Sequence, residues 1–312
     1  MVRLFPAARR AIEADRAEPP VWEADIAAKR DLARKTAAAE AKEEVAEVTG
    51  IDADGVLCRL YTPEDVREGV IVHLHGGGFV FNDVDVHDAA CRRLANRTGL
   101  RVLSVDYRRP PEHCYPAAPD DVDTVIGWMR GDQLLGTLPA YVHGDSAGGN
   151  LALVAALRNP GVFAAMVLVY PFLDPSMSTA GYAMEDGWRE EAVWYWKQYA
   201  ATAADLRDPD LGPYLASDEQ LRDLPPTLVV SAEGDILTAE NEDFALRLAD
   251  LGVEVVAFRA VGQIHGFWRH GPTFPAAESV MAMTGAFVNQ HGPNQHGPNQ
   301  HGPNQHRPAG HP

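Results

Sequence analysis

The chain has 312 residues, of which 46% are hydrophobic and 23% are charged, a balance typical of a soluble globular protein with a full core. Its formal net charge of -17 would repel nucleic-acid phosphates and anionic membrane surfaces, so neither is an expected partner. The first residues contain no apolar run of signal-peptide length, and no stretch reaches the roughly 18 apolar residues of a membrane span. We therefore expect a cytoplasmic protein with one large domain and an accessory segment.

The accessory segment is residues 1–42. It is rich in alanine, arginine and glutamate, with apolar residues at loosely helical spacing, and Pro19 and Pro20 divide it into two helices. A helical leader before the first strand has no place inside a sheet. It either covers the mouth of a site, as a cap segment, or packs on the outer surface, and the pattern leaves both open.

From residue 43 to residue 288, strand and helix patterns alternate. Eight strands are predicted over residues 43–49, 56–61, 70–74, 101–106, 140–143, 164–169, 227–231 and 253–259. Helices are predicted over residues 86–98, 120–129, 146–157, 239–250 and 276–288. The later strands are continuous runs of valine, isoleucine and leucine, as in strands buried on both faces. The alternation predicts an α/β fold with a central, mostly parallel sheet, helices on both faces and an antiparallel start.

Residues 171–226 interrupt this alternation with a loop and an aromatic helix. An insertion of this length between two strands of a sheet is usually a functional cover, and we interpret it as a cap. Its aromatic side chains either form the apolar wall of a pocket or attach the insertion to the body of the protein. They are Trp188, Trp194, Tyr195, Trp196 and Tyr199.

The end of the chain, residues 289–312, repeats the sequence Asn-Gln-His-Gly-Pro. The repeats contain no apolar residue, so they cannot form a core and are predicted to be disordered. We assign no metal function to their histidines.

The cysteines are Cys58, Cys91 and Cys114. Their number is odd and their spacing wide, which indicates neither a disulfide framework nor a zinc site. The sequence predicts reduced thiols.

The segment 140–157 predicts a strand, a sharp turn and a helix. The turn reads Gly144-Asp145-Ser146-Ala147-Gly148, the G-x-S-x-G pattern of a nucleophile elbow. A serine on so tight a turn has strained dihedral angles, and the flanking glycines leave room for it. The turn lifts the Ser146 hydroxyl clear of the sheet and leaves the amide of Ala147 at a helix N-terminus, where an oxyanion is stabilised. Ser146 is therefore the predicted nucleophile.

A serine nucleophile needs a base that is held in place by an acid. Asp235 follows the strand over 227–231 and His265 follows the strand over 253–259, so both are expected at the sheet edge that carries Ser146. The alternatives are that Asp235 only caps the following helix and that His265 is an ordinary loop residue. Other candidates for acid and base are His143, His270, Asp145, Glu233 and Glu240.

An apolar strand over residues 70–74 ends in His75-Gly76-Gly77-Gly78-Phe79. Three consecutive glycines after a strand expose backbone N–H groups with no side chain in the way, which suits an oxyanion. The alternative is a flexible or phosphate-binding loop. No helix with Lys-Ser or Lys-Thr follows, which excludes a P-loop.

Five motifs carry a family resemblance. They are H-G-G-G-F at 75–79, D-Y-R-R-P-P-E-H-C-Y-P-A-A-P-D-D at 106–121, G-D-S-A-G-G-N at 144–150, G-D-I-L at 234–237 and H-G-F at 265–267. Together they resemble the hormone-sensitive-lipase-like group of α/β-hydrolases, the bacterial family IV carboxylesterases, in the subgroup whose elbow reads G-D-S-A-G. The resemblance covers about residues 43–288. Arg109-Pro110, where the family more often has Leu-Ala, and the repeat tail depart from it.

The resemblance implies a serine carboxylesterase that hydrolyses short- to medium-chain acyl esters through an acyl-enzyme, without a metal or cofactor. Ser146, Asp235 and His265 would form the triad. The amides of Gly77, Gly78 and Ala147 would form the oxyanion hole. Side chains expected in the substrate pocket are Phe79, Trp188, Trp194 and Phe267. Such proteins often dimerise through the last strand and helix, here residues 253–288, which gives the expectation of a homodimer.

Three alternatives to an esterase remain open, one of which is a lyase like the similar proteins that dehydrate isoflavanones, although the full triad favours hydrolysis. The same triad also serves amide, lactone and carbamate hydrolysis, and the sequence does not separate these activities. A non-catalytic ligand-binding role is known for the plant gibberellin receptors, which resemble these enzymes but lack the catalytic histidine. The presence of His265 favours an enzyme over a receptor.

Overall fold

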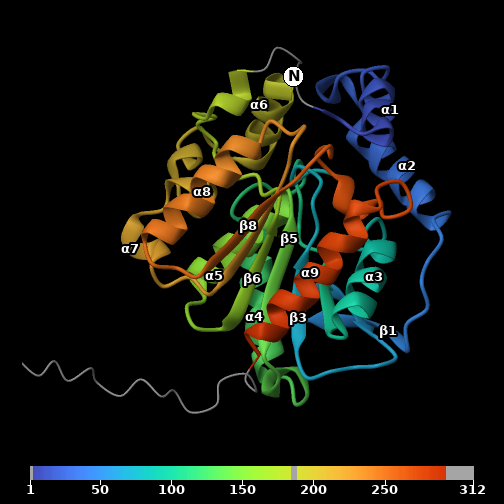
Figure 1. The fold of residues 1–312 in the computed structure, drawn as a ribbon, viewed down its shortest axis with the longest axis vertical. Coiled ribbons are helices and arrows are strands. Elements are labelled where there is room, and N and C mark those ends of the chain that lie inside the picture. The colour runs from blue at the N-terminus through green and yellow to red at the C-terminus, as the bar shows by residue number, and fades with distance from the viewer. Residues whose placement is uncertain (1–2, 184–187, 293–312) are drawn as a thin grey trace, which may run out of the picture.

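The computed structural model describes residues 3–183 and 188–292. Within them, eight strands form one sheet in the order β1-β2-β4-β3-β5-β6-β7-β8 (Figure 1). The strands are β1 (Glu47–Ala53), β2 (Val56–Thr62), β3 (Val70–Leu74), β4 (Arg101–Val105), β5 (Ala140–Asp145), β6 (Phe163–Val169), β7 (Thr227–Ala232) and β8 (Val255–Ala260). β2 is antiparallel to β1 and β4, and every other pairing is parallel. The predicted mostly parallel sheet with an antiparallel start is confirmed.

The helices connect the strands and flank the sheet. They are α1 (Pro6–Asp15), α2 (Ile26–Ala38), α3 (Asp88–Thr98), α4 (Ala117–Gly131), α5 (Ala147–Arg158), α6 (Trp188–Tyr199), α7 (Asp218–Leu221), α8 (Thr238–Asp250) and α9 (Ala276–Gln290). Short 3-10 turns are η1 (Val21–Glu23), η2 (Leu135–Thr137), η3 (Ala180–Ala183), η4 (Asp205–Arg207), η5 (Pro213–Leu215) and η6 (Phe267–Arg269).

The core lies in two layers, one on each face of the sheet. α4, α5 and α8 cover one face, and α3 and α9 lie side by side on the other (Figure 1). The side chains of β3 alternate between the layers, because successive residues of a strand point to opposite faces. Val70, Val72 and Leu74 belong to the first layer and Ile71 to the second. This burial on both faces explains the continuous apolar runs in the sequence.

Several element starts differ from the prediction by one to four residues, and side-chain contacts explain two of them. β1 begins at Glu47 rather than at residue 43, because Glu43 is held by an ion pair of 2.6 Å with Arg97 of α3 instead of a strand partner. α3 begins at Asp88 rather than at residue 86, because the carboxylate of Asp83 accepts the backbone N–H of Val86 in a turn of its own.

The leader crosses the edge of the sheet at which the parallel strands end. The N–H of Phe5 donates to the carbonyl of Gly262, directly after β8, at 3.1 Å. Arg30 of α2 donates to the carbonyl of Val80, after β3, at 2.8 Å and to that of Pro110, after β4, at 2.6 Å. These contacts hold the leader against the loops that follow β3, β4 and β8.

The inserted segment after β6 is attached through its aromatic helix. Trp196 and Tyr199 of α6 are buried in the core layer that also contains α5. Their role is therefore attachment, one of the two interpretations of these aromatic residues. The repeats predicted to be disordered lie outside the described residues from residue 293 onward, and α9 extends to Gln290.

Cys58 and Cys91 are buried and Cys114 is half-buried, all as free thiols. In the described part of the chain, we find no helix with both the length and the apolar character needed to cross a membrane.

Candidate active site

Ser146 stands on the turn between β5 and α5 with φ 56° and ψ -122°, a left-handed conformation that costs energy for a residue with a side chain. The turn is packed too closely for side chains at its two glycines. A Cβ on Gly144 would overlap the carbonyl of Gly148, and a Cβ on Gly148 would overlap the carbonyl of Leu74. The surrounding backbone therefore requires glycine on both sides and supports the strained serine.

The three residues of the predicted triad lie in one line of hydrogen bonds. His265, after β8, has its Nε2 2.8 Å from Ser146 Oγ and its Nδ1 2.6 Å from Asp235 Oδ2. With the ring proton on Nδ1, His265 donates to Asp235 and accepts from the serine hydroxyl. Burial lowers the pKa of His265, but the charge and hydrogen bond of Asp235, together with the charges of Asp145 and Glu191, outweigh it, so the pKa is raised above its usual 6.5.

Asp235 follows β7 and is buried, 4% exposed. Its second oxygen, Oδ1, accepts the N–H of Leu237 at 3.0 Å, which fixes the carboxylate toward the histidine. Asp235 therefore does two things. It organises the turn before α8, which is the alternative role that the sequence allowed, and it also contacts His265.

The competing acid and base candidates are engaged elsewhere. Glu240 is buried inside α8, and Glu233 accepts a backbone N–H from the turn after β8. His143 is buried among other histidines, and His270 accepts a hydrogen bond from the neighbouring arginine. Asp145 accepts the N–H of the first glycine in the loop after β3.

The glycine loop after β3 faces the nucleophile. Gly77 and Gly78 have φ of 124° and 59° and line the same cavity as Ser146. The N–H of Gly76 donates to Asp145 Oδ1 at 3.0 Å and is thus already used. In residues 3–183 and 188–292 the N–H groups of Gly77 and Gly78 donate to no protein acceptor. These two N–H groups are therefore free to donate to a group bound in the cavity.

The triad opens into a cavity of about 230 Å³. Its walls come from the glycine loop, the elbow, the loops after β7 and β8, and one stripe of α6. The lining residues are Gly77, Gly78, Asn82, Asp145, Ser146, Phe172, Trp188, Glu191, Ala192, Tyr195, Asp235, Ile236, Leu237, His265, Gly266, Arg269 and His270.

The sequence interpretation of the pocket wall needs correction. Phe79 does not line the cavity: its ring is fully buried and stacks on Tyr199, with centroids 3.8 Å apart. Phe267 is also fully buried, against Tyr170. Trp194 lies on another side of α6, where it stacks on a neighbouring phenylalanine. Of the four predicted wall residues, the structure places only Trp188 in the cavity wall.

The sequence did contain a signal for the true wall. Trp188, Glu191, Ala192 and Tyr195 all line the cavity, and their spacing of three and four residues defines one face of a helix. A search for aromatic residues alone passes over Glu191, whose carboxyl is buried so that its pKa is raised. Arg269 was missed as well, and the signal for it was its closeness in sequence to His265; His270, one of the alternative base candidates, also lines the cavity.

Comparison with known proteins gives the same architecture. A family model described as the alpha/beta hydrolase fold matches residues 71–269. Ethyl acetate hydrolase from Pseudomonas putida is 31% identical over 263 residues, which cover 78% of this chain and 81% of that protein. The gibberellin receptor GID1B from Arabidopsis thaliana is 32% identical over 202 residues, which cover 60% of this chain and only 56% of the receptor.

A solved esterase structure from Pyrobaculum calidifontis is 34% identical, with a TM-score of 0.80 over 92% of this chain and 98% of that one. The family model spans the elbow and the loops after β7 and β8, and the solved structure matches nearly the whole of both chains. The chain therefore belongs to the α/β-hydrolase fold family, in its hormone-sensitive-lipase-like group.

Proposed function

We propose that this protein is a serine carboxylesterase. The observation that carries the proposal is the line of hydrogen bonds from Asp235 through His265 to Ser146, at 2.6 and 2.8 Å, beside a loop with free backbone N–H groups. In a serine hydrolase this arrangement activates the hydroxyl, stabilises the imidazolium and accepts the oxyanion. The relatives named as esterases support the same reaction class.

In the proposed reaction, His265 takes the proton of Ser146 as the serine oxygen attacks the ester carbonyl. The amides of Gly77, Gly78 and Ala147 hold the negative oxygen of the tetrahedral intermediate. The C–O bond to the alcohol then breaks, and the alcohol leaves with the proton from His265. Water, activated by the same histidine, attacks the acyl-enzyme and releases the acid. Asp235 remains ionised throughout and stabilises the imidazolium.

We further propose esters with short to medium acyl chains as substrates. A cavity of about 230 Å³ partly closed by Trp188 and Tyr195 suits a small ester better than a long lipid chain. The relative from Pseudomonas putida is named for ethyl acetate. Rates for p-nitrophenyl esters from acetate to palmitate test this, since a maximum at the long chains would contradict it.

The leader, residues 1–42, and the insertion, residues 171–226, are proposed as a two-part cap on a catalytic domain that spans residues 43–288. The support is their packing against one another. Val21 of the leader shares a small apolar cluster with Phe81 of the loop after β3, and Trp194 and Tyr195 of α6 pack on it.

We also propose that the protein belongs to the subgroup whose elbow reads G-D-S-A-G and that it is located in the cytoplasm.

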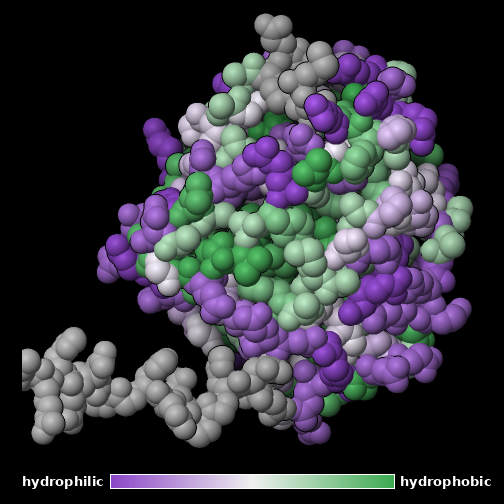
Figure 2. All heavy atoms as spheres, in the orientation of Figure 1, coloured by the Kyte–Doolittle hydropathy of each residue, from purple (hydrophilic) through white to green (hydrophobic). Residues whose placement is uncertain are grey.

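We also propose a homodimer through the edge strand β8. Figure 2 shows an apolar area over β8 and α8, and Leu246 and Val256 there are 66% and 43% exposed. Among the described strands β8 pairs with β7 alone, so its other edge offers backbone groups to a second copy. Light scattering behind a sizing column gives the mass, and a monomer at assay concentration would contradict this.

The function is tested with Ser146→Ala. We expect the variant to lose p-nitrophenyl butyrate hydrolysis by at least about 1,000-fold with an unchanged melting temperature, because only the nucleophile is removed. Ser279→Ala, at an exposed position of α9, is the matched control and should keep full activity. Undiminished turnover by Ser146→Ala would refute the assignment.

Amide, lactone and carbamate hydrolysis by the same triad are the alternatives within enzymes. Matched ester, amide, lactone and carbamate substrates of one acyl group decide between them. A receptor role like that named for the Arabidopsis relative is less well supported, because His265 is present and contacts Ser146. Labelling of Ser146 by a phosphonate, located by mass spectrometry, distinguishes an active hydrolase from a receptor.

A further inference from the structure

Buried histidines lie next to the active site without a role in the proposed reaction. His73 on β3 and His143 on β5 stand directly opposite each other in the parallel pairing, with their Nδ1 atoms 3.0 Å apart. The other nitrogen of His73, Nε2, is 3.2 Å from Nδ1 of His87, the residue before α3. All three side chains are fully buried.

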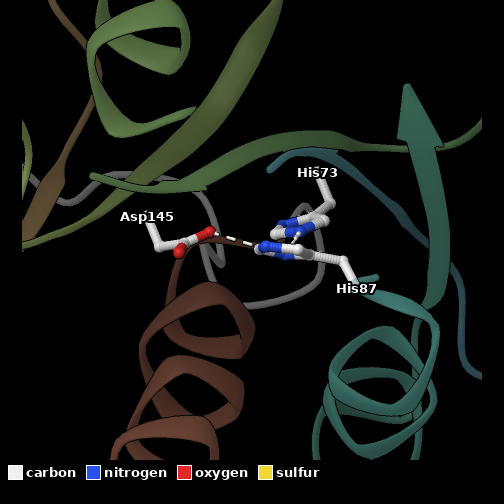
Figure 3. A group of neighbouring side chains, drawn as sticks. All are labelled: His73, His87 and Asp145. Carbon is white, nitrogen blue, oxygen red and sulfur yellow. Dashed lines mark hydrogen bonds and ion pairs between the residues drawn. The ribbon is translucent and has the colours of Figure 1, made fainter. Parts of the chain in front are cut away.

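Asp145 completes this group from the catalytic side. Figure 3 shows its carboxylate pointing toward the ring of His87, with Oδ1 3.7 Å from Nδ1. The three atoms His73 Nε2, His87 Nδ1 and Asp145 Oδ1 all lie within 4.8 Å of one another. Three potential ligand atoms from β3, β5 and the start of α3 thus converge at one point.

This spacing is close to that of a tetrahedral metal site. Zn²⁺ binds imidazole nitrogen and carboxylate oxygen at about 2.0–2.2 Å, which separates neighbouring ligands by about 3.3–3.5 Å. The separations of 3.2 and 3.7 Å lie on either side of this range, and the third pair, His73 Nε2 and Asp145 Oδ1, lies within 4.8 Å. Two imidazoles and one carboxylate suit zinc and its neighbours better than magnesium or calcium.

Outer contacts would hold these ligands in orientation. The Nδ1 atom of His73 is hydrogen-bonded to His143, and Asp145 Oδ1 accepts the N–H of Gly76. A partner on the far nitrogen of a ligating histidine, as His143 is for His73, is usual in metal sites, and the N–H of Gly76 donates to the carboxylate oxygen that would bind the metal. The guanidinium of Arg269 interacts electrostatically with both His87 and Asp145 and opposes a cation. We therefore expect weaker binding than at a structural zinc site.

We propose that His73, His87 and Asp145 form a binding site for Zn²⁺ or a similar transition metal, and that its occupation inhibits the hydrolase. Asp145 lines the catalytic cavity, so a metal ion reaches the group through the same opening as the substrate. The carboxylate that would bind the metal also holds Gly76, next to the oxyanion loop, and precedes Ser146. A bound metal would therefore disturb the loop and lower kcat more than it changes KM. The inhibition rests on the proposed function, but metal binding does not.

The site is tested first without any variant. Crystals of the wild-type protein soaked in ZnCl₂ should show an anomalous peak at the zinc edge within bonding distance of His73, His87 and Asp145. A peak only at His265 or at the histidines of the tail would overturn the proposal. The absence of any peak would indicate that the histidines form a hydrogen-bonded chain alone, and would overturn it as well.

The consequence is tested in solution with His87→Gln and with His113→Gln, an exposed histidine, as the matched control. We expect the zinc concentration for half-inhibition to rise by at least about 100-fold in His87→Gln and to stay unchanged in His113→Gln. The histidines of the tail are unchanged in both variants, so any inhibition by zinc bound there would be equal in the wild type and in both variants. Equal inhibition of the two variants would contradict the proposal. If the protein without zinc hydrolyses no ester, the proposed function fails, and the crystal experiment still decides the metal site.

Discussion

Glu240 offers a quantitative test of how the site is built. It lies in the first turn of α8, shortly after Asp235, and its side chain is fully buried. One carboxyl oxygen accepts the N–H of Leu173 at 2.8 Å and the other accepts the hydroxyl of Tyr182 at 2.7 Å. Glu240 thereby ties the helix that follows the catalytic acid to both ends of the loop leading into the inserted segment.

Burial, only partly offset by these two hydrogen bonds, raises the pKa of Glu240 from 4.5 to about 8. The folded protein therefore keeps a proton that the unfolded chain releases above pH 4.5. Because the folded state binds more protons in this window, stability falls as the pH rises from 4.5 to about 8. The slope is about 1.4 kcal/mol per pH unit, and the whole shift corresponds to roughly 5 kcal/mol.

Glu240→Gln removes the titration and keeps the shape and the hydrogen-bonding ends of the side chain. Between pH 5.5 and pH 7.5, the wild type should lose about 2 to 3 kcal/mol more free energy of unfolding than the variant. Urea unfolding followed by tryptophan fluorescence at several pH values measures this difference. Glu68→Gln, at an exposed glutamate, should follow the wild-type curve. Parallel curves for the wild type and Glu240→Gln would refute a buried, protonated Glu240.

Two further changes test the site and the fold. Asp235→Asn should lower kcat by roughly 10,000-fold. It should also move the acidic limb of the pH profile of kcat/KM to lower pH, because the Asp235 charge raises the pKa of His265. An acidic limb at the same pH in the residual activity of the variant would contradict this. Gly148→Ala should prevent folding or strongly lower the free energy of unfolding, because the new Cβ would meet the carbonyl of Leu74. Gly127→Ala lies in open space on α4 and should raise the free energy of unfolding by about 0.5–1 kcal/mol. Thermal melts compare the two, and similar melting temperatures would show that the elbow is not close-packed.

The sequence predicted the sheet and the triad because both follow from local patterns at strand ends. Ser146, Asp235 and His265 each follow a strand, and parallel strands bring their carboxyl ends to one edge. The structure then joins them within 2.8 Å. The pocket wall did not follow in the same way. Phe79 has φ of 64°, so the chain turns at that residue and its ring enters the core beside Tyr199 instead of the cavity.

For the buried histidines, strand patterns predict the positions of those on strands but not of the one on a loop. His73 and His143 each stand near the end of an apolar strand, three residues before Gly76 and one before Gly144, and strand parity puts both on one face. Their pairing was within reach once β3 and β5 were taken as neighbours. The position of His87 was not, because His87 reaches His73 from a loop whose path depends on Asp83 and its turn rather than on any repeat. A site assembled from two strand positions and one loop position is therefore only half encoded in local sequence, and the loop half decides whether a metal can bind.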